Sequence, residues 1–397
     1  MNGLLEKLGR SLPVSKRTAI LFILLMGTVS LFSDMTYEGA RSINGQYIAV
    51  LGASATAVGF VAGFGELIGY GLRLVSGYIS DRTRQYWTMT IIGYGINVFA
   101  VPFMALAGRW EIAALLMMAE RLGKAIRSPP KDAMLSHATK EMGRGWGFGI
   151  LEAMDQLGAL LGPTIVAVIL FLRGDYQTGY LALAIPAILA TAVLLAARYL
   201  YPRPESFEEI TPKMEASGIK KTFWIYLAGV ALIAAAYADF PLIAFHFEKT
   251  AIAPDTWIPL LYAIAMGVDA VAALVFGRMF DRIGFRVLAG VALVSAFFAP
   301  LVFLGDFNFA ILGMMLWGIG MGAQESIMKA GVAEIVSADK RGTAYGIFNT
   351  GYGLFWFIGS ALMGILYDLS ISYLVLFSIG LQLASVPVFL MIGKSKG

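Results

Sequence analysis

The hydrophobic positions of this chain fall into twelve long apolar stretches separated by short polar segments. A helix needs about 20 predominantly apolar residues to cross a bilayer, and each stretch is close to or above that length. Barrel strands would instead alternate apolar and polar residues over about ten positions. The pattern therefore predicts an all-helical integral membrane protein of twelve spans. The expected spans are 18–48, 55–79, 87–107, 111–130, 146–171, 178–200, 222–246, 257–279, 287–304, 308–333, 344–367 and 371–393.

Composition agrees with a membrane location and narrows the chemistry. Of the 397 residues, 58% are hydrophobic and only 14% are charged, against roughly 25% charged in soluble domains. The chain has no cysteine, which excludes disulfides and thiolate metal sites, and only two histidines, His137 and His246. It also lacks a GxxxxGK[ST] phosphate loop and any nucleophile constellation. We therefore expect no enzyme, no cofactor and no metal site.

Lysine and arginine are distributed unevenly between the two sides of the predicted spans. On one side they number nineteen: Lys7, Arg10, Lys16, Arg17, Arg82, Arg84, Lys131, Lys140, Arg144, Arg203, Lys213, Lys220, Lys221, Arg282, Arg286, Lys340, Arg341, Lys394 and Lys396. The other side carries only Arg109, Arg173 and Lys249. Positively charged loops stay in the cytoplasm, so the pattern predicts a multi-pass protein of the cell (inner, cytoplasmic) membrane with both termini cytoplasmic. The net charge of +4 then reflects topology, and no nucleic-acid partner is expected.

Two motifs recur along the chain and divide it into halves. The stretch Gly77–Arg82 (GYISDR) is matched by Gly277–Arg282 (GRMFDR) 200 residues later, and 144–149 (RGWGFG) is matched by 341–346 (RGTAYG) 197 residues later. Both pairs fall in corresponding loops, which predicts two parallel repeats of six spans with a cavity between them at the bilayer midplane. The longest polar segment, 202–221, is then the cytoplasmic linker between an N-terminal bundle, 1–201, and a C-terminal bundle, 222–397.

These motifs make the chain resemble the major facilitator superfamily of secondary transporters over essentially its whole length. Gly77-x-x-x-Asp81-Arg82-x-Arg84 is similar to the family's loop signature after the second span, without its later glycine, and the second copy is closer to consensus. The resemblance implies a latch that holds the outward-open state, with Asp132 as the partner of Arg82 or Arg84. The alternative is that these charges only anchor loops at the headgroups. The implied latch residues are Gly77, Asp81, Arg82, Arg84, Asp132, Gly277, Asp281 and Arg282.

A second element of the resemblance is Gly158-x-x-x-Gly162-Pro163 in the fifth span. It is similar to an element that the family associates with exporters, although its following glycine pair is replaced by Val166 and Ala167. GxxxG is also a general helix-packing motif in membranes. The family expectation for the oligomeric state is a monomer.

Charged residues inside the predicted spans mark the candidate site, because a charge at the bilayer centre costs at least about 2.5–3.5 kcal/mol. In the resembling fold, spans one, four, seven and ten line the central cavity. The candidates for proton coupling and for the substrate cavity are Asp34, Glu38, Arg41, Arg121, Arg127, Glu152, Asp155, Asp239, Glu325 and Lys329.

Several pairings among the charged residues follow from spacing and remain alternatives to a functional role. Arg41 could neutralise Asp34 or Glu38, which share its helix face. Arg127 could neutralise Glu152 or Asp155. In the second span, Glu66 and Arg73 are seven residues apart and are expected to form a structural pair, and Pro129-Pro130 is expected to end the fourth helix.

The sequence therefore predicts a secondary transporter that works by alternating access, with proton-coupled efflux of a small solute as the leading hypothesis. One alternative is a proton-coupled importer of a sugar, an organic acid or a peptide. Another is a lipid flippase or a non-transporting, receptor-like protein. The expected partners are a small-molecule substrate, membrane lipids, and protons or Na⁺ as the coupling ion.

Overall fold

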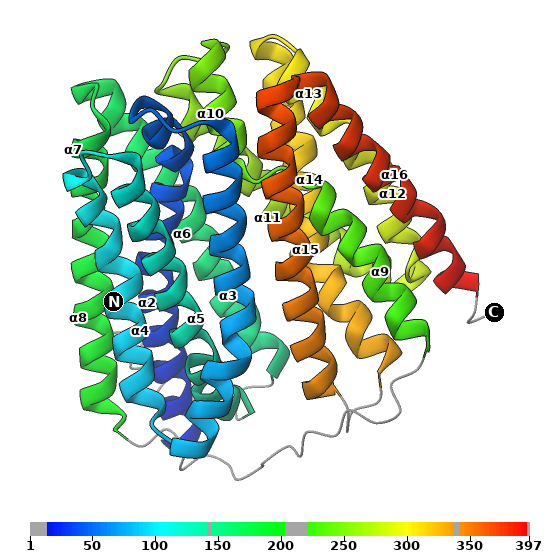
Figure 1. Cartoon of the computed structure of the whole chain (residues 1–397). Coiled ribbons are helices and arrows are strands. Elements are labelled where there is room, and N and C mark those ends of the chain that lie inside the picture. The colour runs from blue at the N-terminus through cyan, green and yellow to red at the C-terminus, as the bar shows by residue number, and fades with distance from the viewer. Residues whose placement is uncertain (1–13, 141–143, 203–220, 337–340, 395–397) are drawn as a thin grey trace.

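The computed structural model describes residues 14–140, 144–202, 221–336 and 341–394. The described residues fold into helices that run back and forth as twelve passes (Figure 1). The first six passes are α2 (Val14–Val50), α3 (Ala55–Thr83), α4 (Tyr86–Phe103) with the 3₁₀ turn η1 (Met104–Leu106), α5 (Trp110–Lys140), α6 (Arg144–Arg173), and α7 (Tyr176–Ala182) with α8 (Ala184–Leu200). The last six are α9 (Lys221–Ala236) with α10 (Phe240–Thr250), α11 (Trp257–Ile283), α12 (Arg286–Ser295) with α13 (Phe298–Leu304), α14 (Phe307–Ile335), α15 (Arg341–Leu369) and α16 (Ile371–Lys394).

The prediction of an all-helical membrane fold is confirmed. Eleven helical segments of the described chain are long and apolar enough to cross a membrane. The pass that is not among them is α5, which carries Glu120, Arg121, Lys124 and Arg127 within two turns. It is 31 residues long and packs against α3 and α4, so it completes the set of twelve. The proposed linker, 202–221, lies almost entirely outside the described residues, and the domain boundaries stay predictions.

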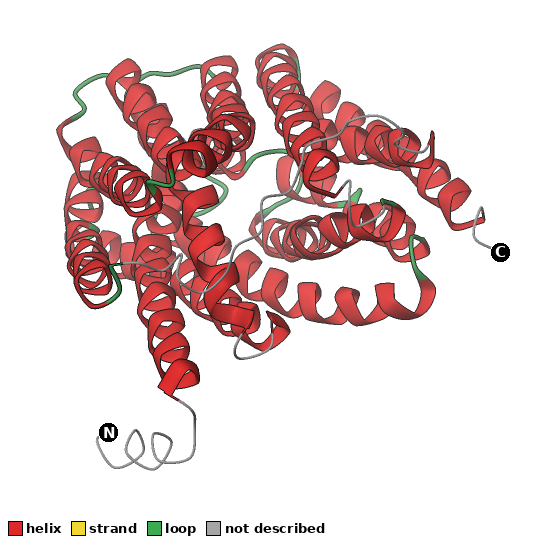
Figure 2. Ribbon diagram, turned by 90° about the horizontal axis from the view of Figure 1, so that it is seen from below, coloured by secondary structure: helices red, strands yellow, loops and turns green. Residues whose placement is uncertain are grey.

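The two sets of six helices lie side by side (Figures 1 and 2). We call the face at which α2 begins and α16 ends the terminal face, which is at the bottom of Figure 1 and toward the viewer in Figure 2. The other face is called the opposite face. The two sets contact each other mainly through α3 with α15, α2 with α10, and α6 with α11. These pairs therefore line the interface between the halves.

The pair α3 and α15 makes its closest approach near the opposite face. A methyl group added at Gly63 would stand 2.7 Å from Ser360 Cβ and 3.0 Å from Phe357 Cα, and Gly59 faces the Ser360 carbonyl. Only glycine permits such contact between helix backbones in lipid. The halves are consequently held in direct contact at this level.

The helix α5 continues through Pro129 and Pro130 to Lys140, so the prediction that these prolines end it was wrong. Pro129 lacks the N–H that would bond the carbonyl of Ala125, and the Ser76 hydroxyl of α3 donates to that carbonyl at 2.7 Å instead. Membrane helices tolerate proline where a neighbouring side chain satisfies the freed carbonyl. The expectation considered α5 alone and could not include Ser76.

The seventh pass is interrupted where a continuous span was predicted. Between α9 and α10, Tyr237 and Ala238 are fully buried, and Pro241 lies in the first turn of α10. The Trp317 indole donates to the Ala238 carbonyl at 2.9 Å, which satisfies part of the irregular backbone. This pass is also the most enclosed of the eleven apolar spans: 83% of its apolar 18-residue stretch is buried, against 33–61% in the other ten. It therefore lies inside the protein and touches little lipid.

Candidate functional site

A cavity of about 470 Å³ lies between the two halves near the middle of the passes, and we call it the central cavity. Its ionisable walls carry six carboxylates and three basic groups. They are Asp34 and Glu38 of α2, Arg73 of α3, Lys124 of α5, Glu152 and Asp155 of α6, Asp269 of α11, and Glu325 and Lys329 of α14. The cavity is thus polar, acidic and built from both halves.

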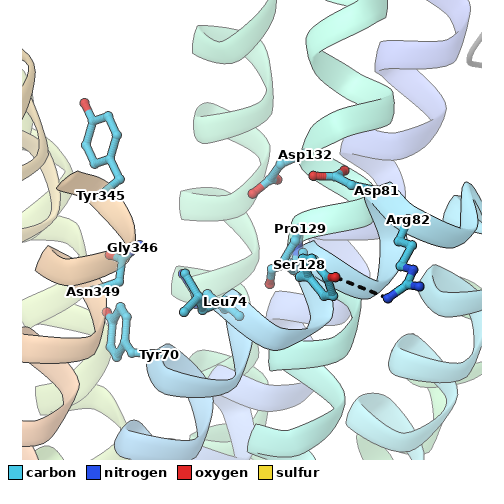
Figure 3. Close-up of a pocket in the computed structure, with 13 residues that line it drawn as sticks. Tyr70, Leu74, Asp81, Arg82, Ser128, Pro129, Asp132, Tyr345, Gly346 and Asn349 are labelled. Atoms are coloured by element: carbon cyan, nitrogen blue, oxygen red, sulfur yellow. Dashed lines mark hydrogen bonds between the residues drawn. The ribbon is translucent and has the colours of Figure 1, made fainter. Parts of the chain in front are cut away.

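A second cavity of about 620 Å³, the vestibule, adjoins the central cavity on the side of the terminal face. Tyr70, Arg73 and Asn349 line both cavities, so the two cavities are direct neighbours. Figure 3 shows the vestibule between α3 and α5 on one side and α15, with Tyr345 and Asn349, on the other. Tyrosine, leucine, glycine and proline form much of its wall. The central cavity therefore communicates with the terminal face along a largely apolar path.

The opposite face is closed by hydrogen bonds between the halves. The Gln46 amide donates to the Asp255 carbonyl at 3.3 Å, and Tyr176 donates to Glu248 at 2.9 Å. The backbone N–H and hydroxyl of one threonine, Thr56, donate to the Asp368 carboxylate at 2.8 and 2.6 Å. Together with the contact of α3 and α15, these bonds separate the central cavity from the opposite face.

A buried ion pair joins the halves just above the central cavity. Arg41 Nη2 of α2 lies 2.9 Å from Asp239 Oδ1, at the break between α9 and α10, and 3.3 Å from Glu66 Oε1 of α3. The other Asp239 oxygen accepts from the Trp356 indole at 3.1 Å. Among the described residues, Arg41 forms no ion pair with Asp34 or Glu38, the partners that spacing on α2 offered. Its guanidinium points across the helix interface and pairs with Asp239 and Glu66.

The network continues within the first half. Arg121 Nη2 lies 3.1 Å from Glu66, and its Nε lies 3.3 Å from Glu120. Asn97 of α4 donates to the Glu120 carboxylate at 2.7 Å. The expected Glu66–Arg73 pair does not form: Glu66 is occupied by two arginines, and the Arg73 guanidinium lies over the Tyr70 ring at 4.8 Å. Spacing on α3 alone gave no information about the arginines on α2 and α5.

A second polar contact between the halves lies beside this ion pair. The Tyr262 hydroxyl of α11 donates to Glu38 of α2. Tyr37, the residue before Glu38 on α2, accepts a hydrogen bond at 2.7 Å from the Lys124 ammonium, which also lies 3.9 Å from the Tyr37 ring centroid. Glu38 is therefore the cavity carboxylate that is directly attached to the other half.

Asp34 lies lower on α2 and is 8% exposed. Its nearest cation is Arg127, at 3.9 Å, which also lies over the Tyr94 ring at 4.2 Å. The predicted pairing of Arg127 with Glu152 or Asp155 is therefore not what the structure shows. Asp155 and Glu152 lie on α6 at the cavity wall, and Glu152 accepts from Gln156 on its own helix at 3.2 Å. The approach of α2 and α6 brings these acids close to Asp34.

That approach depends on the GxxxGP element of the fifth span. Gly158 of α6 faces the Leu31 carbonyl and Asp34 Cβ, while Gly162 faces the Met35 carbonyl. Pro163 lies within α6, which continues to Arg173. In this chain the element is therefore a contact surface between α6 and the helix that carries Asp34.

The remaining predicted cavity residues lie on α14. Glu325 and Lys329 are one turn apart and both face the central cavity. Among the described residues no ion pair joins them, although their spacing would permit one. Glu325 differs in this from Asp34, Glu66 and Glu120 of the first half, each of which lies within 4 Å of an arginine.

The predicted latch residues lie at the terminal face without the expected pairing. Asp81, Arg82 and Asp132 line the vestibule (Figure 3), but Arg82 donates to Tyr78 at 3.3 Å. Within the described chain, no ion pair joins Asp132 to Arg82 or Arg84. Arg84 instead ends α3 in the left-handed conformation.

The glycines of the two latch motifs differ in their surroundings. A methyl group at Gly77 would be in ordinary contact with Pro129 of α5 at 3.5 Å. At Gly277, the corresponding space is open among the described residues. Asp281 and Arg282 are exposed at the C-terminal end of α11, whose last turns also include Gly277.

Sequence reasoning missed six residues of the site. Five of them were visible as charges inside spans but were not selected: Glu66, Arg73, Glu120, Lys124 and Asp269. The sixth, Tyr262, has no signal in the sequence, since its role depends on contact with Glu38 across the interface.

Comparison with known proteins agrees with this architecture. The sequence profile described as Major Facilitator Superfamily matches residues 18–360, with a second match over 225–395. Protein Rv2265 of Mycobacterium tuberculosis is 38% identical over 397 residues, covering 98% of this chain and 96% of the relative. Multidrug resistance protein MdtH of Photorhabdus laumondii is 26% identical over 333 residues, covering 81% and 80%. A crystal structure of a mutant of the nucleoside transporter NupG superposes with a TM-score of 0.74 at 13% identity, covering 94% of this chain and 99% of that chain, which shows a shared fold.

Proposed function

This chain belongs to the Major Facilitator Superfamily, and on that premise we propose that it exports a small solute in exchange for protons by alternating access. As a secondary transporter it needs a solute site that opens to one face at a time. The observation that carries the proposal is the central cavity, which lies between the halves, opens through the vestibule to the terminal face, and is closed toward the opposite face.

The carboxylates of the cavity support coupling to protons. Asp34, Glu38 and Asp155 lie in or beside the cavity, where a low dielectric constant disfavours several negative charges close together. Such groups exchange protons as their surroundings change between water and protein. Among the described residues, the Asp34 carboxylate has one arginine, at 3.9 Å, whereas Glu38 accepts a hydrogen bond from Tyr262 of the other half. Asp34 is therefore held less directly than Glu38, and we assign it a role in carrying the coupled proton.

Two further observations support the direction. The relative MdtH is named a multidrug resistance protein, and export of a drug is one way in which a transporter gives resistance to it. The excess of lysine and arginine in the loops at the terminal face favours a cytoplasmic location for that face. A cavity open to that face would then receive its solute from the cytoplasm.

The latch residues fit the same transport cycle, in which they would stabilise the conformation whose terminal face is closed. Asp81, Arg82 and Asp132 all lie on the α3 and α5 side of the vestibule, across from α15 (Figure 3). We propose that they pair, together with Asp281 and Arg282 of the second half, when the terminal face closes. The distance of this group from the second half across the vestibule is then the expected state of a latch that is open.

The test is a proton-flux measurement in proteoliposomes that contain a trapped pH dye. Lipophilic cations, sugars, amino acids, peptides and organic acids are added in turn to the parent protein, to Asp34→Asn and to the control Asp306→Asn, whose new side chain still caps α14. We expect one solute class to trigger proton movement in the parent and the control, opposite in direction to the solute, and no such movement in Asp34→Asn. Proton movement in the same direction as the solute would replace export with import, and full coupling in Asp34→Asn would remove Asp34 from the mechanism.

A further inference from the structure

Asp269 is the most deeply buried carboxylate of the central cavity. It lies in the middle of α11 and is 1% exposed. Two glycines of α14 bring the helices together at this point, because Gly318 faces the Ala265 carbonyl and Gly322 faces the carbonyl of Asp269 itself. The close crossing places the Asp269 side chain in the cavity wall beside Gln324 and Glu325.

No positive charge compensates Asp269. Among the described residues, its carboxylate has no ion pair or hydrogen bond, and Oδ1 is completely buried. The ionisable groups that act on it are all acids: Glu325 of α14, Glu152 of α6 and Glu38 of α2. Burying an isolated carboxylate is expensive unless it is neutralised. Asp269 therefore requires either a proton or a cation from outside the protein.

The buried acids Asp239 and Glu66 contrast with Asp269. Each of these buried acids lies within 3.3 Å of an arginine guanidinium. The fold supplies internal counter-charges in the first half and at the interface. In the second half it leaves a buried acid facing the cavity with none.

The surroundings of Asp269 indicate the kind of cation. Met266 and Ala273 flank it on α11, and the Phe348 and Tyr352 rings of α15 complete the wall. Aromatic faces attract cations, and methionine adapts to apolar ligands of different shape. A cavity of about 470 Å³ lies within the 300–1,000 Å³ range typical of sites for drug-sized ligands. The wall is therefore suited to an organic cation with an apolar body.

We propose that Asp269, assisted by Glu325, binds the positively charged group of an organic cation and releases its own proton when the cation arrives. This inference rests on the proposed function and names its substrate class. One carboxylate cannot hold a proton and a cation at the same time, so loading from the terminal face displaces one proton. Return of a proton from the opposite face then releases the cation.

The test measures binding and proton release together on the purified full-length protein. Tetraphenylphosphonium and the smaller tetraethylammonium are the probes, binding is followed by calorimetry, and release is followed with a pH indicator in weakly buffered solution. We expect the parent and Asp306→Asn to bind a probe and to release a proton. Asp269→Asn should bind roughly tenfold more weakly or worse, as for the loss of a charge-assisted contact, and should release no proton. Asp269→Glu, which keeps the charge, should restore the release.

Several outcomes would overturn the inference. If Asp269→Asn binds the probe and releases protons as the parent does, Asp269 is not the site. If the parent binds neither probe while a neutral or anionic solute triggers proton flux in proteoliposomes, the substrate class is wrong but the proposed exchange stands. If no solute moves protons in the parent, the proposed function itself fails. Asp269→Glu also tests the exchange step. If this variant is folded and binds the probe but releases no proton, the exchange step is wrong.

Discussion

The ion pair between Arg41 and Asp239 is expected to stabilise the conformation in which the opposite face is closed. The substitution Asp239→Asn removes the charge that α10 presents to α2 and keeps the shape of the side chain. Arg41 is not left unpaired, because Glu66 of the same half remains 3.3 Å away. The Asn oxygen can still accept from Trp356. The substitution therefore removes one contact between the halves and little else.

The size of the effect follows from what is lost. Removing one partner of a buried ion pair costs about 3–5 kcal/mol when the other charge is left uncompensated, but Glu66 prevents that here. The loss is closer to that of one charge-assisted hydrogen bond, about 1.5–3 kcal/mol. Since Arg41 and Asp239 lie on different halves, the bond belongs to the conformation with a closed opposite face. Its removal should raise the population with an open opposite face roughly 10- to 150-fold, at about 1.4 kcal/mol per tenfold.

The assay uses the absence of cysteine from the chain, so that one introduced thiol is the only one. Ser360 is 1% exposed and lies between α3 and α15 near the opposite face. In a Ser360→Cys background, the thiol reacts with a maleimide only when that face opens, and the labelling rate follows the open population if opening is fast. We expect Asp239→Asn to accelerate labelling by the factor above and Asp306→Asn to leave it unchanged. Equal labelling rates in the parent and in folded Asp239→Asn would refute the role of the ion pair.

Two further predictions concern packing. Ser76→Ala removes the side-chain donor that the described structure gives to the Ala125 carbonyl. The loss of about 1–3 kcal/mol should lower the thermal unfolding temperature in detergent. Ser80→Ala is the control, because the Ser80 hydroxyl bonds within its own helix, and an equal effect of the two substitutions would contradict this role of Ser76. Gly63→Ala places a methyl group against α15, so the opposite face should close less completely and transport should slow. Gly71→Ala is the control, because its methyl group would meet only Leu67 Cδ1, at 3.9 Å, and the change should be neutral or slightly stabilising. Normal transport by Gly63→Ala would show that the contact can relax.

The sequence was sufficient to predict the passes because each is defined by its own length and apolarity. It was not sufficient to predict the partners of the charges. Arg41 shares a helix face with Asp34 and Glu38, but its guanidinium pairs with Glu66 and Asp239 on other passes. In a bundle, a neighbouring helix offers as many partners as the residue's own helix does, and spacing along one helix says nothing about them.

The same reason explains the two errors of helix continuity. Whether Pro129 ends a helix depends on Ser76, which is 53 residues away in the sequence, and whether the seventh pass is continuous depends on Trp317 and the groups that bind Asp239. The continuity of both helices therefore depends on tertiary contacts. Asp269 is the converse case, since its importance lies in partners that the fold does not provide.

The enclosure of α9 and α10 has a consequence for the order in which the protein is assembled. Of these helices, α9 packs against α15 and α16, which are synthesised last. The seventh pass must therefore be in contact with lipid when it first enters the membrane. It loses this contact when the final two passes pack against it. During that interval Asp239 would face hydrocarbon, unless the finished first half already offers Arg41. The arginine that joins the halves in the folded protein is thus available from the moment the second half begins to insert, so the first half acts as a template for the second.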